Sequence, residues 1–211
     1  MVFLTLEGLD GSGKSTQLAL LREWLAASGR EVVATREPGG TEVGERVREL
    51  VLNGPDMTAW PEALLYAAAR AELVATVVRP ALERGAVVVS DRYVDSSLAY
   101  QGVARGLGIE QVYELNMAVV GGLLPQRTFL LRVDASRAVG RVQGEPDRIE
   151  REALDFHRRV DEGFLEVAAR FPERIAVLDG TLPPEELAAR IRADVEALLA
   201  GAAAGTAGVR P

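Results

Sequence analysis

Cysteine is absent from this 211-residue chain, and histidine occurs only once. Without cysteine there is no disulfide framework, no thiolate nucleophile and no cysteine-ligated zinc or iron–sulfur site. One histidine cannot form a histidine-cluster metal site. His157 lies in LDFHRRVDEGF, a pattern that predicts an amphipathic helix, so we interpret it as a structural or surface residue.

Long apolar runs and a basic charge balance are also missing. No stretch approaches the about 20 apolar residues of a membrane helix, and the N-terminus lacks the basic and apolar regions of an export signal. The net charge of −7 argues against general affinity for nucleic acid, which needs a basic surface. We therefore expect a cytoplasmic, globular protein that binds neither membranes nor nucleic acid.

Lysine is equally scarce, with one residue, Lys14, among 24 basic residues. It lies in GLDGSGKST, directly after the apolar run VFLTL. This stretch matches G-x-x-x-x-G-K-[ST], a loop whose backbone N–H groups and lysine hold the phosphates of a nucleotide. Retaining the compact ammonium only here indicates a genuine phosphate loop. A Ras-type GTPase is excluded, because its N-K-x-D motif would need a second lysine.

The strand, glycine-rich loop and helix in succession give this motif its structural context. We expect Lys14 to reach the β- and γ-phosphates and Ser15 to bind Mg²⁺. Asp91 follows a second apolar strand, in VVVSD, and is expected to bind the same ion directly or through water; helix capping is the alternative. The predicted phosphate-binding residues are Gly8, Asp10, Gly11, Ser12, Gly13, Lys14, Ser15 and Thr16.

Short β-rich runs alternate with longer helical patterns, which predicts an α/β fold of the P-loop NTPase type: three layers, with helices flanking a five-stranded parallel sheet. Residues 1–200 are expected to form one domain with a lid around 137–150, followed by a flexible tail, 201–211. Strands are expected at Phe3–Leu6, Glu31–Thr35, Ala86–Ser90, Thr128–Val133 and Arg174–Leu178. Helices are expected at Lys14–Ala27, Thr41–Leu52, Pro61–Arg84, Ser96–Arg105, Glu110–Gly121, Arg151–Ala169 and Glu185–Ala200.

An arginine stands in the helical stretch LLYAAARAELVATVV, which is apolar nearly all round. A buried Arg70 is costly unless it is paired or meets a ligand. Tyr66 lies four residues earlier on the same face, and the two side chains together can stack on and hydrogen-bond a planar base. From the helix alone, a buried ion pair with Glu37 or Asp95 is an equal alternative.

Two further stretches, TREPGGTEVGERVREL and SDRYVDSSLAYQG, begin where strands end. In a parallel sheet these ends face the same crevice as the phosphate loop. The two stretches supply Arg36, Glu37, Arg48, Asp91, Arg92, Ser97, Tyr100 and Gln101. So many arginines and small polar groups predict an anion pocket that can read a base.

The abundance of arginines indicates which kind of group accepts the phosphoryl. A hydroxyl acceptor usually needs a carboxylate base, whereas a phosphate monoester is already anionic at neutral pH. The stretch SRAVGRVQGEPDRIE adds Arg137, Arg141 and Arg148 around a Gly-Pro loop that could close over the transferred group. An ordinary solvated loop is the alternative.

The stretches EGLDGSGKST, TREPGGT, DRYVDSSLAYQG and PDRIE, in this order and spacing, resemble the thymidylate kinase family, bacterial type, from about Val2 to Leu199. The resemblance implies ATP-dependent phosphorylation of dTMP to dTDP with Mg²⁺, for dTTP biosynthesis. It also implies a homodimer through the apolar helices, including Pro61–Arg84. Alternatives are a kinase for another pyrimidine nucleotide or a nucleoside, and a switch ATPase that grips a protein.

By matching positions, the resemblance implies that Tyr66 stacks on thymine, where the family usually has Phe. Arg70 and Gln101 would read the base edge with Ser97 nearby, and Tyr100 would favour deoxyribose by crowding the 2′ position. The implied dTMP-binding residues are Asp10, Glu37, Arg48, Tyr66, Arg70, Arg92, Ser97, Tyr100 and Gln101.

The resemblance also assigns the charged groups around the phosphates. Arg48 and Arg92 would hold the acceptor phosphate, and Asp10 would lie near it or near the sugar hydroxyl. Another type of the family has a catalytic arginine in the phosphate loop, but position 11 here is glycine, which assigns that role to the lid. The implied catalytic residues are Asp10, Lys14, Arg92, Arg141 and Arg148. The lid, GRVQGEP, is short, so the choice among its arginines stays open.

Overall fold

The computed structural model describes residues 1–141 and 144–207. Five strands form one parallel sheet in the order β2-β3-β1-β4-β5, which confirms the predicted fold class. The strands are β1 (Val2–Glu7), β2 (Val32–Arg36), β3 (Val87–Asp91), β4 (Arg127–Arg132) and β5 (Ile175–Asp179). Each overlaps the range expected from the sequence.

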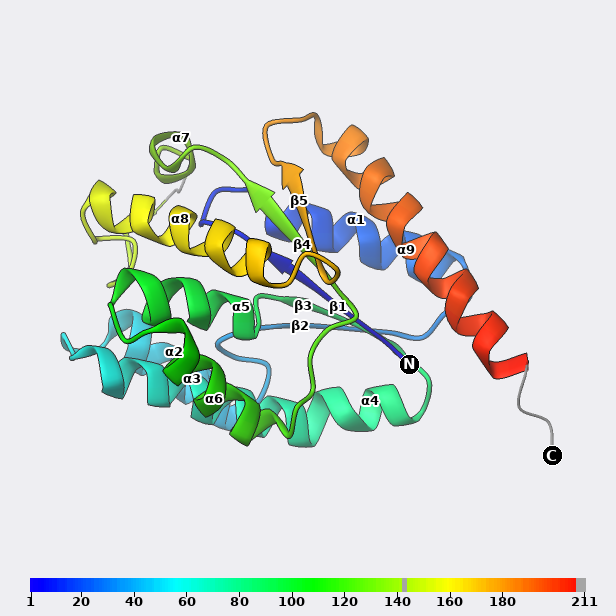
Figure 1. Ribbon diagram of the computed structural model, residues 1–211, viewed down its shortest axis with the longest axis horizontal. Helices are drawn as coiled ribbons and strands as arrows, with labels where there is room; N and C mark the ends of the chain where they lie inside the picture. Colours follow the sequence, from blue (N-terminus) through cyan, green and yellow to red (C-terminus); the bar gives the residue numbers. More distant parts are fainter. Residues whose placement is uncertain (142–143, 208–211) are drawn as a thin grey trace.

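Helices cover both faces of the sheet (Figure 1). One face carries α1 (Lys14–Ala27) and α9 (Pro184–Ala207), and the short α7 (Ala135–Val139) lies beyond the carboxyl ends of the strands. The other side carries α2 (Glu42–Asn53), α3 (Ala59–Leu73), η1 (Val74–Val78), α4 (Arg79–Glu83), α5 (Val94–Ser97), η2 (Leu98–Ala104), α6 (Ile109–Val120) and α8 (Leu154–Arg170).

The central strand β1 is buried along its whole length because both of its faces are covered. Leu4 and Leu6 pack with α1 and α9, where Ile191 belongs to the apolar stripe of the last helix. Phe3 points to the opposite side, into the cluster formed with α3 to α8. Two cores thus hold β1 in place and fix the position of the loop that follows it.

Several helices differ from their expected ranges. The helix expected at Pro61–Arg84 contains the π-helical segment η1, and the one expected at Ser96–Arg105 begins at Val94 and is largely the π-helix η2. Helix α7 occupies the start of the segment around 137–150 that was expected to be a lid, where a loop was expected. Helix α9 continues past Ala200 to Ala207, and residues 208–211 lie outside the described part.

In the described part of the chain, every helix is too short or too polar to cross a membrane.

Candidate active site

The phosphate loop, Gly8–Thr16, connects the end of β1 to the start of α1. Gly8 has φ +134°, and a Cβ there would lie 2.4 Å from the carbonyl oxygen of Leu131. Gly11 has φ +80°, and its Cβ would lie 2.2 Å from the carbonyl oxygen of Ala138 in α7. Both positions therefore need glycine. Position 11 has no room for the arginine side chain that another type of the family has in this loop.

Lys14 folds back over this loop. Its Nζ donates to the carbonyl oxygens of Gly8 at 3.0 Å and Leu9 at 2.9 Å, and it lies 3.6 Å from the carboxylate of Asp10. Burial lowers the pKa of Lys14, as does the nearby charge of Arg92, while Asp10 opposes the shift. The ammonium is thus held beside the loop at the position that the motif predicts.

Ser15 and Asp91 come together at the carboxyl ends of β1 and β3. The Oγ of Ser15 donates to Oδ2 of Asp91 at 3.4 Å, and Oδ1 of Asp91 is buried with no hydrogen-bond partner among the residues that the structure describes. No group of three or more acidic, histidine or cysteine side chains within 1–141 and 144–207 could hold a metal. One hydroxyl and one carboxylate fit Mg²⁺, which keeps several waters and binds few protein ligands.

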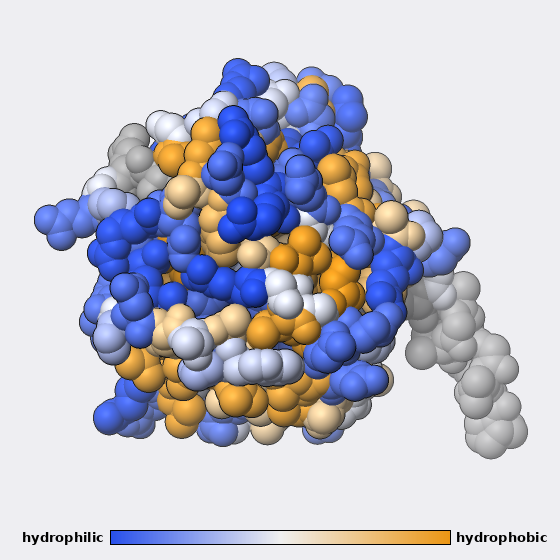
Figure 2. All heavy atoms as spheres, turned by 60° about the vertical axis from the view of Figure 1, so that its left-hand side comes forward, coloured by the Kyte–Doolittle hydropathy of each residue, from blue (hydrophilic) through white to orange (hydrophobic). Residues whose placement is uncertain are grey.

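Two adjoining clefts open at this end of the sheet, on a face where hydrophilic side chains predominate (Figure 2). The first, which we call the tyrosine cleft, is lined by Asp10, Glu37, Pro38, Arg48, Leu52, Tyr66, Arg70, Arg92, Ser96, Ser97, Tyr100, Gln101, Asp147, Ile149 and Glu150. The second, the lysine cleft, is lined by Asp10, Gly11, Gly13, Lys14, Ser15, Thr16, Arg36, Glu37, Arg48, Asp91, Arg92 and Arg141. Asp10, Glu37, Arg48 and Arg92 border both.

Arg92 stands where the two clefts meet. Its φ of +71° is unusual for a residue with a side chain, a strain that is often found at functional sites. The guanidinium donates to Asp10 at 2.7 Å and to Ser96 at 3.0 Å, and lies 5.3 Å from the ring centre of Tyr100. Burial raises the pKa of Asp10, but Arg92 and Lys14 outweigh burial and hold that pKa well below its ordinary value. Asp10 is therefore a carboxylate.

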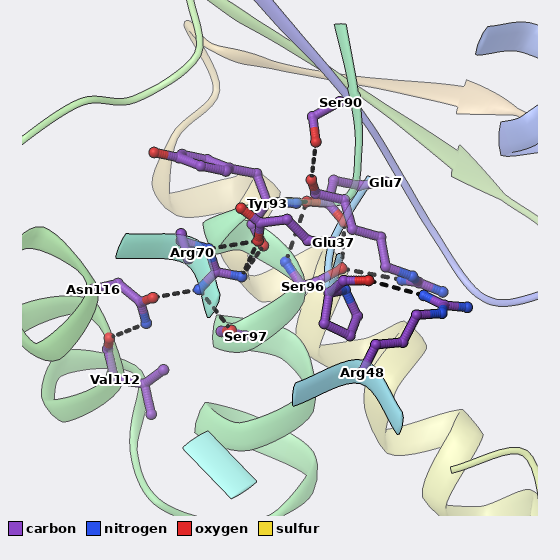
Figure 3. A network of polar contacts seen from close by, with 12 residues as sticks. Glu7, Glu37, Arg48, Arg70, Ser90, Tyr93, Ser96, Ser97, Val112 and Asn116 are labelled. Carbon is purple, nitrogen blue, oxygen red and sulfur yellow. Dashed lines mark hydrogen bonds and ion pairs between the residues drawn. The ribbon is translucent and has the colours of Figure 1, made fainter. Parts of the chain in front are cut away.

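Arg70 is buried, and its guanidinium is hydrogen-bonded to four residues (Figure 3). Nε lies 2.6 Å from Glu37, and the two terminal nitrogens donate to Ser97 at 3.0 Å, to the Tyr93 carbonyl at 3.0 Å and to Asn116. The same side chain lines the tyrosine cleft, as does Tyr66 one turn earlier. Arg70 therefore forms a buried ion pair with Glu37 and also lies beside the cleft.

The other candidate partner of Arg70, Asp95, pairs with Arg174 instead, at 2.6 Å.

The lid arginines lie in different places. Arg141 lines the lysine cleft, and its guanidinium donates to the carbonyl oxygen of Gly11 at 3.3 Å. Arg148 lines neither cleft: it is buried, donating to the Val51 carbonyl at 2.8 Å and to Glu62 at 2.7 Å. Arg137 is exposed on α7. The structure therefore brings Arg141 to the phosphate loop and holds Arg148, expected to be catalytic, in the packing of α2 and α3.

The sequence analysis missed three buried polar residues around the site. Glu7 accepts from the backbone N–H of Tyr93 at 2.7 Å, and Glu62 pairs with Arg148. Asn116 of α6 accepts from Arg70. A charged residue in an apolar helix was the signal that singled out Arg70, and it applied equally to Glu62. Nothing in the sequence pattern separates Glu7 or Asn116 from ordinary polar residues.

His157 is buried in α8, as a structural residue would be, with Nε2 lacking a hydrogen-bond partner in the described part of the chain.

The phosphate loop precedes the first helix of a five-stranded parallel sheet, and the lysine cleft beside it adjoins the tyrosine cleft, which is lined with arginines. These features define a P-loop phosphotransferase. The family model described as thymidylate kinase matches residues 6–191. The chain is 53% identical over 206 residues to the thymidylate kinase of Clavibacter sepedonicus, covering 96% of this chain and 98% of that one. It is 52% identical over 198 residues to that of Deinococcus radiodurans, covering 92% and 96%.

The crystal structure of thymidylate kinase from Ehrlichia chaffeensis superposes with a TM-score of 0.78 at 31% identity, covering 92% of this chain and 98% of that chain. This chain belongs to the thymidylate kinase family. It is therefore a nucleotide-binding kinase of nucleotide biosynthesis, and the family identified from its motifs is confirmed.

Proposed function

We propose that this chain transfers the γ-phosphoryl group of ATP to dTMP, giving ADP and dTDP for dTTP synthesis. The observation that carries this proposal is the junction of the two clefts at Arg92 and Asp10. A donor phosphate chain in the lysine cleft and an acceptor phosphate in the tyrosine cleft would meet there. The acceptor phosphate is itself the nucleophile, so no general base is needed.

The tyrosine cleft has the groups that a thymidine monophosphate requires. Tyr66 stacks on the base, Arg70 and Gln101 face its edge near Ser97, and Tyr100 leaves room for deoxyribose only. Glu37 orients Arg70 through the ion pair described above. These roles are supported by the joint presence of all six side chains along one cleft.

Charged groups at the junction hold the acceptor phosphate. Arg48 and Arg92 bind its oxygens, and Asp10 positions Arg92 and faces the sugar or the phosphate. Arg48 donates to the Pro38 carbonyl at 3.0 Å, and this hydrogen bond holds its guanidinium at the wall of the cleft. Preorganised cations of this kind stabilise a bound anion most strongly where water is excluded.

On the donor side, Lys14 binds the β- and γ-phosphates with the backbone N–H groups of the phosphate loop. Ser15 and Asp91 would hold Mg²⁺, which neutralises charge on the phosphates when it is bound. Arg141 stabilises the charge on the transferred group, a role supported by its place over Gly11. The adenine contacts the loop around Asp179–Leu182, because Gly180 lies close to the phosphate loop.

We further propose that the enzyme is a cytoplasmic homodimer. Trp60 and Leu64 of α3 are 45% and 53% exposed, and Val43 and Leu50 of α2 are 46% and 41% exposed. Large apolar side chains gathered on two packed helices favour a self-association surface.

The test is turnover with ATP and Mg²⁺ against dTMP, dUMP, UMP, AMP and thymidine, with identification of the product. We expect dTDP from dTMP and no reaction with thymidine, which lacks the anionic nucleophile. Slow release of phosphate whatever the acceptor would contradict the proposal and favour a switch ATPase.

A further inference from the structure

Glu62 is an acidic residue without a role in the proposed reaction, and it is fully buried in α3. Its carboxylate accepts hydrogen bonds from Gln101 at 2.9 Å, from Arg105 at 3.1 Å and from Arg148 at 2.7 Å. Burial raises the pKa of Glu62, but these hydrogen bonds outweigh burial and hold that pKa below its ordinary value. Glu62 is therefore an ionised group that offers acceptor atoms only.

This fixes the orientation of a neighbouring amide. The end of the Gln101 side chain that faces Glu62 must be the NH₂ group, because a carboxylate cannot donate to a carbonyl. The carbonyl oxygen of Gln101 is consequently on the other side of the planar amide. Gln101 lines the tyrosine cleft, and its carbonyl oxygen takes no protein hydrogen bond within the described residues.

We propose that Glu62 is a positioning residue for base specificity, because it makes Gln101 present a hydrogen-bond acceptor to N3 of the pyrimidine. This inference rests on the proposed function, in which Gln101 faces the base. Thymine carries a hydrogen at N3 and can donate to that oxygen. Cytosine has a lone pair at N3, so two acceptors would face each other in a desolvated site, which is unfavourable.

Arg70 complements this arrangement and does not duplicate it. A guanidinium offers donors only, which suit the O4 acceptor of thymine. Gln101 supplies the acceptor proposed for N3, so the preference for thymine over cytosine at N3 depends on which way its amide is turned. Glu62 determines that direction from outside the cleft, because it does not line the cleft itself.

The experiment compares kcat/KM for dTMP and 5-methyl-dCMP, which share the methyl group, sugar and phosphate and differ only at N3 and C4. In Glu62→Gln the new amide both donates and accepts, so Gln101 is free to turn over. We expect the preference for dTMP to fall by at least about tenfold, with KM for ATP unchanged. An unchanged preference would overturn the inference.

Two variants separate positioning from general destabilisation. Glu62→Asp keeps an acceptor-only group and should keep the preference. Arg105→Met removes another partner of Glu62 while Arg148 still compensates its charge. It should lower the melting temperature and leave the preference intact; a relaxed preference in Arg105→Met would indicate a merely structural effect.

Gln101→Ala distinguishes failure of this inference from failure of the proposed function. If it raises KM for dTMP while Glu62→Gln keeps the preference, only the positioning role is wrong. If it leaves KM for dTMP unchanged, the base does not occupy the tyrosine cleft, and both fail. Should Glu62→Gln not fold, a neutron structure of the unaltered protein with dTMP decides: NH₂ toward Glu62 is expected, and the reverse orientation contradicts the inference.

Discussion

Arg70 is 1% exposed, yet its guanidinium lines a cleft that is open to a ligand. The sequence left two interpretations equal, a buried ion pair or a base-reading group, because a helix pattern shows burial and not partners. The structure joins them, since the ion pair with Glu37 compensates the charge of the guanidinium and fixes its direction beside the cleft. A buried charge beside a ligand cleft is tolerated when an opposite charge pairs with it in this way.

Arg70→Ala is expected to weaken dTMP binding by at least about tenfold and to leave ATP binding nearly unchanged, as titration calorimetry would measure. It should also destabilise the fold by about 3–5 kcal/mol, because Glu37 is left buried and uncompensated. Combining Arg70→Met with Glu37→Met should restore the stability but not dTMP binding. Recovery of dTMP binding in the double variant would mean that Arg70 is structural only.

Glu7 gives a pH dependence of the folded state. Burial and the charge of Asp95 raise the pKa of Glu7 from 4.5 to about 8. Between these values the folded protein binds a proton that the unfolded chain has lost. The stabilisation is therefore full below pH 4.5 and is lost as the pH rises to about 8.

Glu7→Gln should remove this dependence. Urea unfolding between pH 5 and 8 is expected to show a slope of up to about 1.4 kcal/mol per pH unit for the unaltered protein and a flatter profile for the variant. Identical slopes in the two proteins would show that Glu7 is ionised throughout.

At the scale of elements, the strands and most helices were predictable from the sequence because apolar periodicity reports burial on one or two faces. The two π-helical segments were not, since Val74–Val78 and Leu98–Ala104 each continue directly from an α-helix and no sequence signal marks the change. The sequence shows three arginines in the segment expected to form a lid, but not which of them lies beside the phosphate loop. That depends on Glu62 being near enough to hold Arg148, a contact that spans 86 residues.

Variants of the two lid arginines should therefore behave differently. Arg141→Ala is expected to lower kcat by about 100-fold with little change in the melting temperature, because it removes a cation from the transferred group. Arg148→Ala should lower the melting temperature more and kcat less, since it leaves Glu62 with a partner missing. Steady-state kinetics and thermal unfolding measure both. A large loss of kcat in Arg148→Ala without destabilisation would show that this arginine moves to the phosphates.

At the scale of the whole molecule, the exposed apolar side chains of α2 and α3 are the basis of the proposed dimer. Leu64→Glu is expected to convert a dimer to a monomer in sedimentation velocity, because it replaces the most exposed of these four apolar side chains, at 53%, with a charge. Val177→Glu is a matched control, since Val177 is 47% exposed on β5, away from these helices. Equal masses for the unaltered protein and Leu64→Glu would contradict the proposed interface.

The position of β1 has a consequence for synthesis on the ribosome. This strand comes before the other four strands in the sequence but lies in the middle of the sheet, and its neighbours β3 and β4 begin only at Val87 and Arg127. A nascent chain therefore carries an apolar strand without its first partner until Val87–Asp91 has been translated, and without its second until Arg127–Arg132 follows. Such a strand invites chaperone binding, and the nucleotide-binding loop that follows it can take its final shape only late in translation.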